Sequence, residues 1–140
     1  YQYWPNAERY GHSMINDFNN GTVGWTDWNI LLNENGGPNH VENFCFAPIH
    51  ADLIADSLIY TPSYYYLGHF SKFITPGAKR ISTSSSQSRL ESTSWINPNG
   101  EIITIVMNMS NDKLEYSLYF SDKESKLPIN PRAIQTLIYQ

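Results

Sequence analysis

The chain has 140 residues, enough for an ordinary domain with its own core, but too few for a complete eightfold α/β barrel, which needs about 250 residues. The net charge is −4 and the nine Lys and Arg residues form no basic run, so the composition argues against a nucleic-acid partner. A single cysteine excludes an intrachain disulfide, and no apolar run approaches the ~18 residues of a membrane span.

The first predicted element is a helix over residues 6–19, followed by a strand. Apolar residues recur near helical spacing at Tyr10, Met14, Ile15 and Phe18. Asn6 is the expected N-cap, and Asn19-Asn20-Gly21 ends the helix. Thr22–Asn29 is too short, and too rich in β-branched and aromatic residues, to be another helix, so we expect a buried strand. A helix, a short turn and a buried strand form the αβ step of a parallel barrel or open sheet.

The middle of the chain is predicted to hold a long loop, a hairpin and a second helix. Ile30–Pro48 has turn chemistry around Gly36-Gly37-Pro38, and its aromatic residues favour an ordered functional loop. Ile49–Leu53 and Ser57–Tyr60 are predicted to pair as a small hairpin over that loop. Thr61-Pro62 is typical of a helix start, with the hydroxyl as N-cap. The face of this helix that should pack on a sheet carries Tyr66, Leu67, Phe70, Phe73 and Ile74, and His69 should help to pack it.

Residues 79–140 have the pattern of an antiparallel β domain. Short alternating segments divided by turns predict strands at Arg80–Ser86, Leu90–Ile96, Ile102–Met109, Leu114–Phe120 and Ala133–Tyr139. Asn97-Pro98-Asn99-Gly100 is the expected hairpin turn between two of them. Five strands are few for a β-sandwich, which typically has about seven.

Several segments, in this order and spacing, carry a family resemblance. They are Val23-Gly24-Trp25-Thr26-Asp27-Trp28-Asn29, Gly36-Gly37-Pro38-Asn39, Asn43-Phe44 and Tyr66-Leu67-Gly68-His69-Phe70-Ser71-Lys72-Phe73-Ile74. With them the chain resembles the C-terminal part of glycoside hydrolase family 30, the glucosylceramidase (acid β-glucosidase) group. The resemblance covers residues 1–80 well and rests on a looser strand pattern beyond them.

The resemblance implies an α/β plus all-β fold. Residues 1–77 would be the last units of a (β/α)8 TIM barrel, and residues 78–140 a C-terminal antiparallel β-sandwich that earlier segments of the protein complete. We therefore expect a fragment with an exposed apolar sheet edge. Its partners would be the remainder of its own chain and, through unpaired strands, other copies of itself.

Four residues are candidates for a substrate-binding site. In a parallel barrel the reactive groups lie where strands end, which is where the predicted strand places Asp27 and Trp28. An indole suits the C–H face of a sugar, and nearby carboxylates and carboxamides orient it by hydrogen bonds. The resemblance implies that Trp28 lines the sugar subsite and that Asn43 and Phe44 line the same pocket. The alternatives are packing for Trp28 and a turn role for Asn43.

No catalytic residue is expected in this chain. Asp27 with Glu34 or Glu42 would supply the two carboxylates that glycoside hydrolysis needs. The family, however, draws both catalytic glutamates from earlier barrel strands, which would precede Tyr1. Asp27 is instead expected to be a buried hydrogen-bond acceptor that holds the loops and an arginine or indole in place.

The remaining reactive residues point to no further chemistry. The four histidines show no paired spacing on a common face, so no metal site is expected, and the implied reaction needs no cofactor. Cys45 is expected to be a small buried hydrophobe. Asn20-Gly21-Thr22 and Asn108-Met109-Ser110 fit the N-glycosylation pattern, which has meaning only in a eukaryotic secretory pathway.

The sequence is therefore interpreted as part of a retaining β-glycosidase resembling glucosylceramidase, with a β-glycoside or glycolipid substrate. It would carry walls of the sugar pocket and be inactive alone. Two alternatives stay open: the same fold acting on another β-glycoside such as xylan or β-1,6-glucan, and a non-catalytic carbohydrate-binding or interaction module. The compartment is not fixed, although a secreted, periplasmic or lysosomal location is favoured over the cytoplasm.

Overall fold

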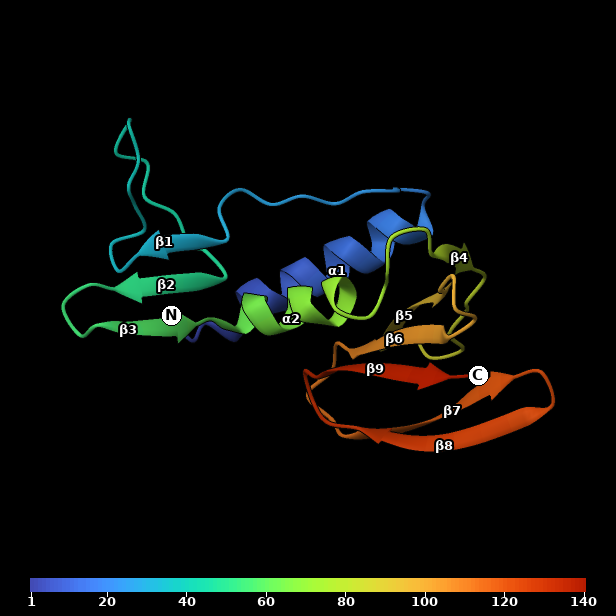
Figure 1. Cartoon of the computed structure of the whole chain (residues 1–140). Coiled ribbons are helices and arrows are strands. Elements are labelled where there is room, and N and C mark those ends of the chain that lie inside the picture. Colours follow the sequence, from blue (N-terminus) through green and yellow to red (C-terminus); the bar gives the residue numbers. More distant parts are fainter.

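The computed structural model describes residues 1–140 as two helices packed on a four-stranded sheet, with a smaller sheet at one end (Figure 1). The helices are α1 (Trp4–Asn19) and α2 (Pro62–Ser71). The strands are β1 (Leu31–Asn33), β2 (Ile49–Asp52), β3 (Ser57–Tyr60), β4 (Lys79–Ile81), β5 (Leu90–Ile96), β6 (Ile102–Asn108), β7 (Leu114–Phe120), β8 (Lys123–Ile129) and β9 (Ile134–Tyr139). Neither helix is long and apolar enough to cross a bilayer.

Helix α1 begins earlier than the sequence predicts. Tyr3 occupies the N-cap position and Pro5 lies in the first turn, where its missing N–H costs nothing. Asn6 is therefore inside the helix and not its N-cap, and its side-chain oxygen accepts a hydrogen bond from Arg9. The predicted end at residue 19 is confirmed, with Asn20 as the C-cap.

The predicted strand Thr22–Asn29 does not form. These residues run back past α1 as an unpaired stretch that leads into β1 (Figure 1). Val23 is fully exposed, so the stretch is not buried either. A strand exists only where a neighbouring strand satisfies its backbone groups, and no segment of this chain lies beside these residues in that way.

The small sheet is built around β2. The predicted hairpin is confirmed, because β2 and β3 pair antiparallel with Ile49 opposite Tyr60. Strand β1, which the sequence did not predict, pairs parallel to β2. The buried His50 ring accepts a hydrogen bond from the Ala47 N–H and contacts the Asn33 carbonyl oxygen at 2.8 Å. It thereby ties the two ends of the long loop together.

Helix α2 starts at Pro62 as predicted, but Thr61 does not cap it. The Thr61 hydroxyl donates to the Pro48 carbonyl at 3.0 Å and lies 2.7 Å from the Ser63 hydroxyl. It therefore binds the preceding loop and not a backbone N–H of the helix. The predicted apolar face is confirmed in part: Tyr66 and Phe70 are buried in the core that the helices share with the sheet, and Leu67 packs against it. The helix ends at Ser71, so Phe73 and Ile74 pack against this core from beyond its end. His69 also packs against the sheet, with its Nδ1 2.8 Å from the hydroxyl of Thr136 in β9.

The larger sheet has the order β4-β5-β6-β9, and β7 and β8 form a separate antiparallel ribbon. Strand β6 is buried on both faces, so the molecule has three layers here: helices, sheet and ribbon (Figure 1). The core on the helix side contains Ala7, Met14, Ile15, Tyr66, Phe70, Trp95, Ile103, Ile105 and Met107. The core on the ribbon side contains Leu90, Val106, Leu114 and Ile129.

The bounds of β5, β6, β7 and β9 match the prediction to within one residue, and the other two strands of this region differ from it. The turn after Asn97 is confirmed, since Gly100 adopts φ +87° between β5 and β6. Strand β4 is shorter than predicted, and β8 was missed altogether. Cys45 is half-buried and not buried as expected.

Candidate functional site

The structure leaves the four candidate substrate-binding residues in solvent. The Trp28 side chain is 76% exposed and has no hydrogen bond and no ring contact. Phe44 is 58% exposed and lies over Gly37, whose added Cβ would stand 3.3 Å from the Phe44 ring. Asn43 is exposed, and its backbone N–H donates to the Asn39 side chain at 3.4 Å. Asp27 is exposed as well.

These residues do not come together as a closed pocket. Asn43 and Phe44 are neighbours on the long loop, and Trp28 lies on the unpaired stretch before β1. No hydrogen bond or ring contact joins Trp28 to either of them. Within this chain their side chains are exposed and line none of the three main cavities.

Asp27 is an acceptor, but not a buried one, and its partner is neither an arginine nor an indole. The Tyr10 hydroxyl on α1 donates to Asp27 Oδ2 at 2.7 Å. Burial, together with the Asp27 carboxylate, raises the pKa of Tyr10 well above its usual value, so the phenol stays protonated as a donor. The nearby indole, Trp25, donates from Nε1 to Asp17 Oδ2 at 3.2 Å. The rings of Tyr10 and Trp25 meet edge to face at 5.6 Å between centroids.

The sequence analysis missed the roles of Tyr10 and Asp17, although a signal was present. The two residues are seven apart, two turns along one face of a helix. Trp25 and Asp27 are two apart, which places their side chains on one side of an extended chain. Tyr10 can donate to Asp27, and Trp25 can donate to Asp17. Such complementary groups, spaced seven residues apart in the helix and two residues apart in the following segment, indicate that the helix face lies against that segment.

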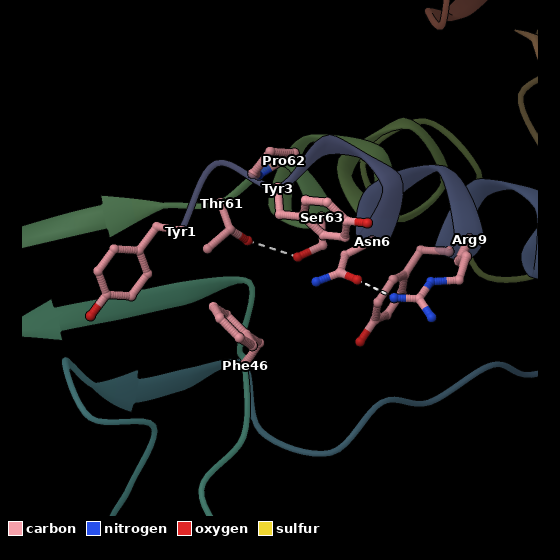
Figure 2. A pocket seen from close by; sticks show the side chains of 9 residues that line it. Tyr1, Tyr3, Asn6, Arg9, Phe46, Thr61, Pro62 and Ser63 are labelled. Carbon is pink, nitrogen blue, oxygen red and sulfur yellow. Dashed lines mark hydrogen bonds between the residues drawn. The ribbon is translucent and has the colours of Figure 1, made fainter.

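A cavity of about 250 Å³ lies where α1 and α2 begin (Figure 2). Its walls are Tyr1, Tyr3, Asn6, Arg9, Tyr10, Phe46, Thr61, Pro62 and Ser63. Figure 2 shows the Arg9 guanidinium held by Asn6, and Phe46 facing Tyr1 from the loop that leads to β2. The Tyr1 and Phe46 rings are 6.4 Å apart between centroids. None of the four candidate residues lines this cavity.

A second cavity, of about 1020 Å³, opens between the four-stranded sheet and the β7–β8 ribbon. Its sheet wall is rich in hydroxyl groups. Thr104 is one of these wall residues, with its Oγ1 2.7 Å from Ser94 Oγ and 2.9 Å from the Tyr139 hydroxyl. The ribbon therefore covers the sheet incompletely, as a sandwich with missing strands would.

No pair of carboxylates faces either cavity, or a third one beside α2. Glu115 is the only acidic residue among the walls of all three. Glycoside hydrolysis needs two carboxyl groups about 5 Å apart in retaining enzymes, and about 6.5–9.5 Å in inverting ones. No group of three His, Cys, Asp or Glu side chains is placed to hold a metal ion.

Comparison with known proteins gives the same family in both halves of the chain. Residues 1–74 match the family model of the glycosyl hydrolase family 30 TIM-barrel domain. Residues 77–137 match that of the glycosyl hydrolase family 30 beta sandwich domain.

The curated relatives are glucosylceramidases. Lysosomal acid glucosylceramidase of Mus musculus is 39% identical over 116 residues, which cover 82% of this chain and 22% of the mouse protein. Putative glucosylceramidase 3 of Caenorhabditis elegans is 34% identical over 140 residues, 98% of this chain and 27% of the nematode protein. The chain thus spans about a quarter of the length of these relatives.

Solved structures share the fold. SrfJ from Salmonella typhimurium superimposes with a TM-score of 0.95 at 37% identity, over 98% of this chain and 31% of SrfJ. The endo-beta1,6-glucanase BT3312 superimposes with a TM-score of 0.81 at 20% identity, over 91% of this chain and 30% of the glucanase. Together with the domain matches, these likenesses confirm the resemblance seen in the sequence. The chain belongs to glycosyl hydrolase family 30, in which it forms the end of the TIM-barrel domain and the C-terminal β-sandwich domain.

Proposed function

We propose that the chain is the C-terminal part of a retaining β-glycosidase that resembles glucosylceramidase and hydrolyses a β-glucoside or glucosylceramide. The observation that carries this proposal is the 39% identity to the mouse glucosylceramidase, over most of this chain. In the retaining reaction one carboxylate attacks the anomeric carbon while a second carboxyl group protonates the departing oxygen, and water then releases the sugar. Both groups would come from the rest of the protein, since no carboxyl pair faces a cavity here. No cofactor is required.

In this proposal Trp28, Asn43 and Phe44 form part of the sugar pocket, and Asp27 supports it. The Trp28 indole supports this assignment because it is exposed and engages no other ring or polar group of the chain. An aromatic face without a partner suits stacking on a sugar ring, and the Asn43 carboxamide can then orient the hydroxyl groups.

The rest of the protein would cover the apolar surface that this chain leaves open. Apart from Trp28 and Phe44, large apolar side chains between residues 23 and 58 are exposed at Val23, Ile30, Leu31, Val41, Phe46, Leu53, Ile54 and Leu58. So much exposed apolar surface is unusual for a finished monomer. We propose that residues 1–77 belong to the barrel and residues 78–140 to the sandwich, and that the rest of the barrel lies against this surface.

The experiment is a substitution in the full-length protein. Trp28→Ala should lower kcat/KM by at least about tenfold, because one pocket-wall contact is worth ~1–3 kcal/mol. Tyr119→Ala is the matched control, since Tyr119 is a similarly exposed ring on the β-sandwich side. Unchanged kinetics for Trp28→Ala, with an unchanged melting temperature, would remove Trp28 from the pocket.

The substrate is tested in the same assays. Glucosylceramide and aryl β-glucosides are the expected substrates, and xylan and β-1,6-glucan are the comparison arms. The endo-beta1,6-glucanase structure supports the glucan arm only through the fold, since it is 20% identical to this chain. Turnover of a polysaccharide, with none of the glucosides, would favour a family 30 enzyme of another specificity.

A further inference from the structure

We propose that Tyr10 and Asp17, both on α1, are positioning residues that set the place of Trp28 in the sugar pocket. This inference rests on the proposed function, because it assigns Trp28 to that pocket. Neither residue would touch the sugar. Each acts through a hydrogen bond to the stretch that carries Trp28.

The stretch from Val23 to Asn29 makes no backbone hydrogen bond within this chain. The last bond before it runs from Thr22 N to Asp17 O at 3.0 Å, and the next after it runs from Ile49 N to Ile30 O at 3.0 Å. Within this chain, the stretch is therefore connected to the rest of the fold through its side chains.

Only two side-chain hydrogen bonds hold this stretch, and both come from α1. Tyr10 binds Asp27 at 2.7 Å, and Asp17 binds Trp25 at 3.2 Å. The edge-to-face contact of the Tyr10 and Trp25 rings lies between these two bonds and joins them into one cluster. Helix α1 is in turn fixed to the sheet through its buried Ala7, Met14 and Ile15, so the cluster is attached to a rigid element.

The position of Trp28 next to Asp27 links this cluster to the indole. Trp25 and Asp27 both contact α1, whereas the Trp28 side chain makes no hydrogen bond and no ring contact in this chain. Trp25 is accordingly half-buried, while Trp28 is 76% exposed. Because Asp27 directly precedes Trp28, the Tyr10–Asp27 bond fixes the backbone next to the indole.

The test uses kcat/KM of the full-length enzyme on a β-glucoside. Tyr10→Phe keeps the ring contact and removes the donor, and it should lower kcat/KM by about three- to tenfold. Asp17→Ala should have a similar effect, and Asp17→Asn should restore activity because its amide oxygen still accepts from Trp25. Tyr65→Phe is the control, since Tyr65 is exposed on α2 and its hydroxyl has no partner in this chain.

A double-mutant cycle separates positioning from a general loss of stability. If Tyr10 acts through Trp28, Tyr10→Phe should cause no further loss in the Trp28→Ala background. Two results would overturn the inference and leave the proposed function standing. One is that Tyr10→Phe still lowers kcat/KM in the Trp28→Ala background. The other is that Tyr10→Phe and Asp17→Ala have normal kcat/KM while Trp28→Ala is impaired. Unchanged kinetics in Trp28→Ala itself is a different outcome, which overturns the pocket assignment and this inference with it. Melting temperatures within a degree or two of the wild type show that each variant is folded.

Discussion

The hydroxyl of Tyr66 on α2 donates a 2.9 Å hydrogen bond to the carbonyl oxygen of Arg132, in the turn between β8 and β9. The indole of Trp4 on α1 donates to the same oxygen at 2.8 Å. Arg132 has φ +54°, a conformation that few residues with a side chain adopt without support. Both helices thus stabilise one turn of the β region. These two hydrogen bonds connect the barrel part of the chain to the sandwich part.

Removal of the Tyr66 hydroxyl should weaken this junction. Burial, followed by the nearby Glu8 charge, raises the pKa of Tyr66 to about 12, so its hydroxyl is protonated and donates at neutral pH. Tyr66→Phe should lower the free energy of unfolding of the full-length protein by about 0.5–1.5 kcal/mol, the usual net value of one hydrogen bond. Denaturant unfolding measures the change. Tyr65→Phe on the same helix should have no effect, and equal losses in the two variants would contradict the assigned role.

Substitution by alanine should change the stability of the protein in opposite directions at two helical glycines. A Cβ at Gly11 on α1 would stand 2.8 Å from both Met107 Sδ and Tyr66 Cδ1, in the closed core between helices and sheet. Gly11→Ala should therefore cost about 1–3 kcal/mol through overpacking. A Cβ at Gly68 on α2 would meet nothing within 4 Å, so Gly68→Ala should stabilise the protein by up to about 1 kcal/mol through helix propensity. Thermal unfolding of the two variants measures the sign of each stability change. Destabilisation of both variants would mean that Gly68 faces another part of the enzyme.

His69 should make stability depend on pH. Burial lowers the pKa of His69 below its usual 6.5, so the folded protein keeps this imidazole neutral where the unfolded chain already binds a proton. The contribution of His69 to stability is complete above pH about 6.5 and is lost as the pH falls from there through the folded-state pKa. His69→Gln should therefore flatten the dependence of the melting temperature on pH below about 6.5. An unaltered slope in His69→Gln would refute the assignment.

The isolated 140-residue chain should self-associate. Large apolar side chains are exposed at many positions between residues 23 and 58, which soluble monomers usually cover. Strand β3 is also an unpaired sheet edge, which favours pairing with another chain. Sedimentation velocity with a glycan titration should show concentration-dependent association and weak or no sugar binding. A monomer that binds glycans in the micromolar to millimolar range would instead support a non-catalytic binding module.

Local patterns were enough to predict the elements whose own side chains fill the core. The bounds of β5 and β7 match the prediction, and so does the start of α2, because alternation and Thr61-Pro62 are local signals. Strand β8 was missed because Lys123, Glu124 and Lys126 face solvent and only Ile129 is buried, so pairing with β7 defines the strand more than any apolar pattern does. Residues 22–29 have the apolar pattern of a strand, but pairing requires a neighbour, which a single-sequence pattern does not reveal.

The candidate site was also predictable only in part from the sequence. Trp28 and Asn43 were chosen from a family motif, which indicates what residues do without showing what holds them. The contact of Tyr10 with Asp27 links residues 17 apart, and it follows from α1 lying against the unpaired stretch. The seven-residue and two-residue spacings can be seen in the sequence alone. The sequence does not show that the helix lies against the stretch, because the packing of a helix on an extended segment is a tertiary property.

The two N-glycosylation patterns should behave differently if the full-length protein is expressed through a eukaryotic secretory pathway. Asn108 is 1% exposed, its amide donates to the carbonyls of Asp112 and Asn130, and its oxygen accepts from Ser110. A glycan there would break all of these bonds, so folded protein should carry none. Asn20 is exposed beyond the end of α1, and space is open around Gly21. We expect a glycan on Asn20.

Peptide mapping by mass spectrometry before and after N-glycosidase treatment measures both sites. Thr22→Ala should abolish the modification, because the pattern needs a hydroxyl at its third position, and Ser110→Ala should leave the glycan content unchanged. Secreted, folded protein with a glycan on Asn108 would show that the turn after β6 tolerates a bulky group. The hydrogen bonds around that amide would then be dispensable for folding, contrary to the burial and the close donor distances of 2.7 and 3.0 Å.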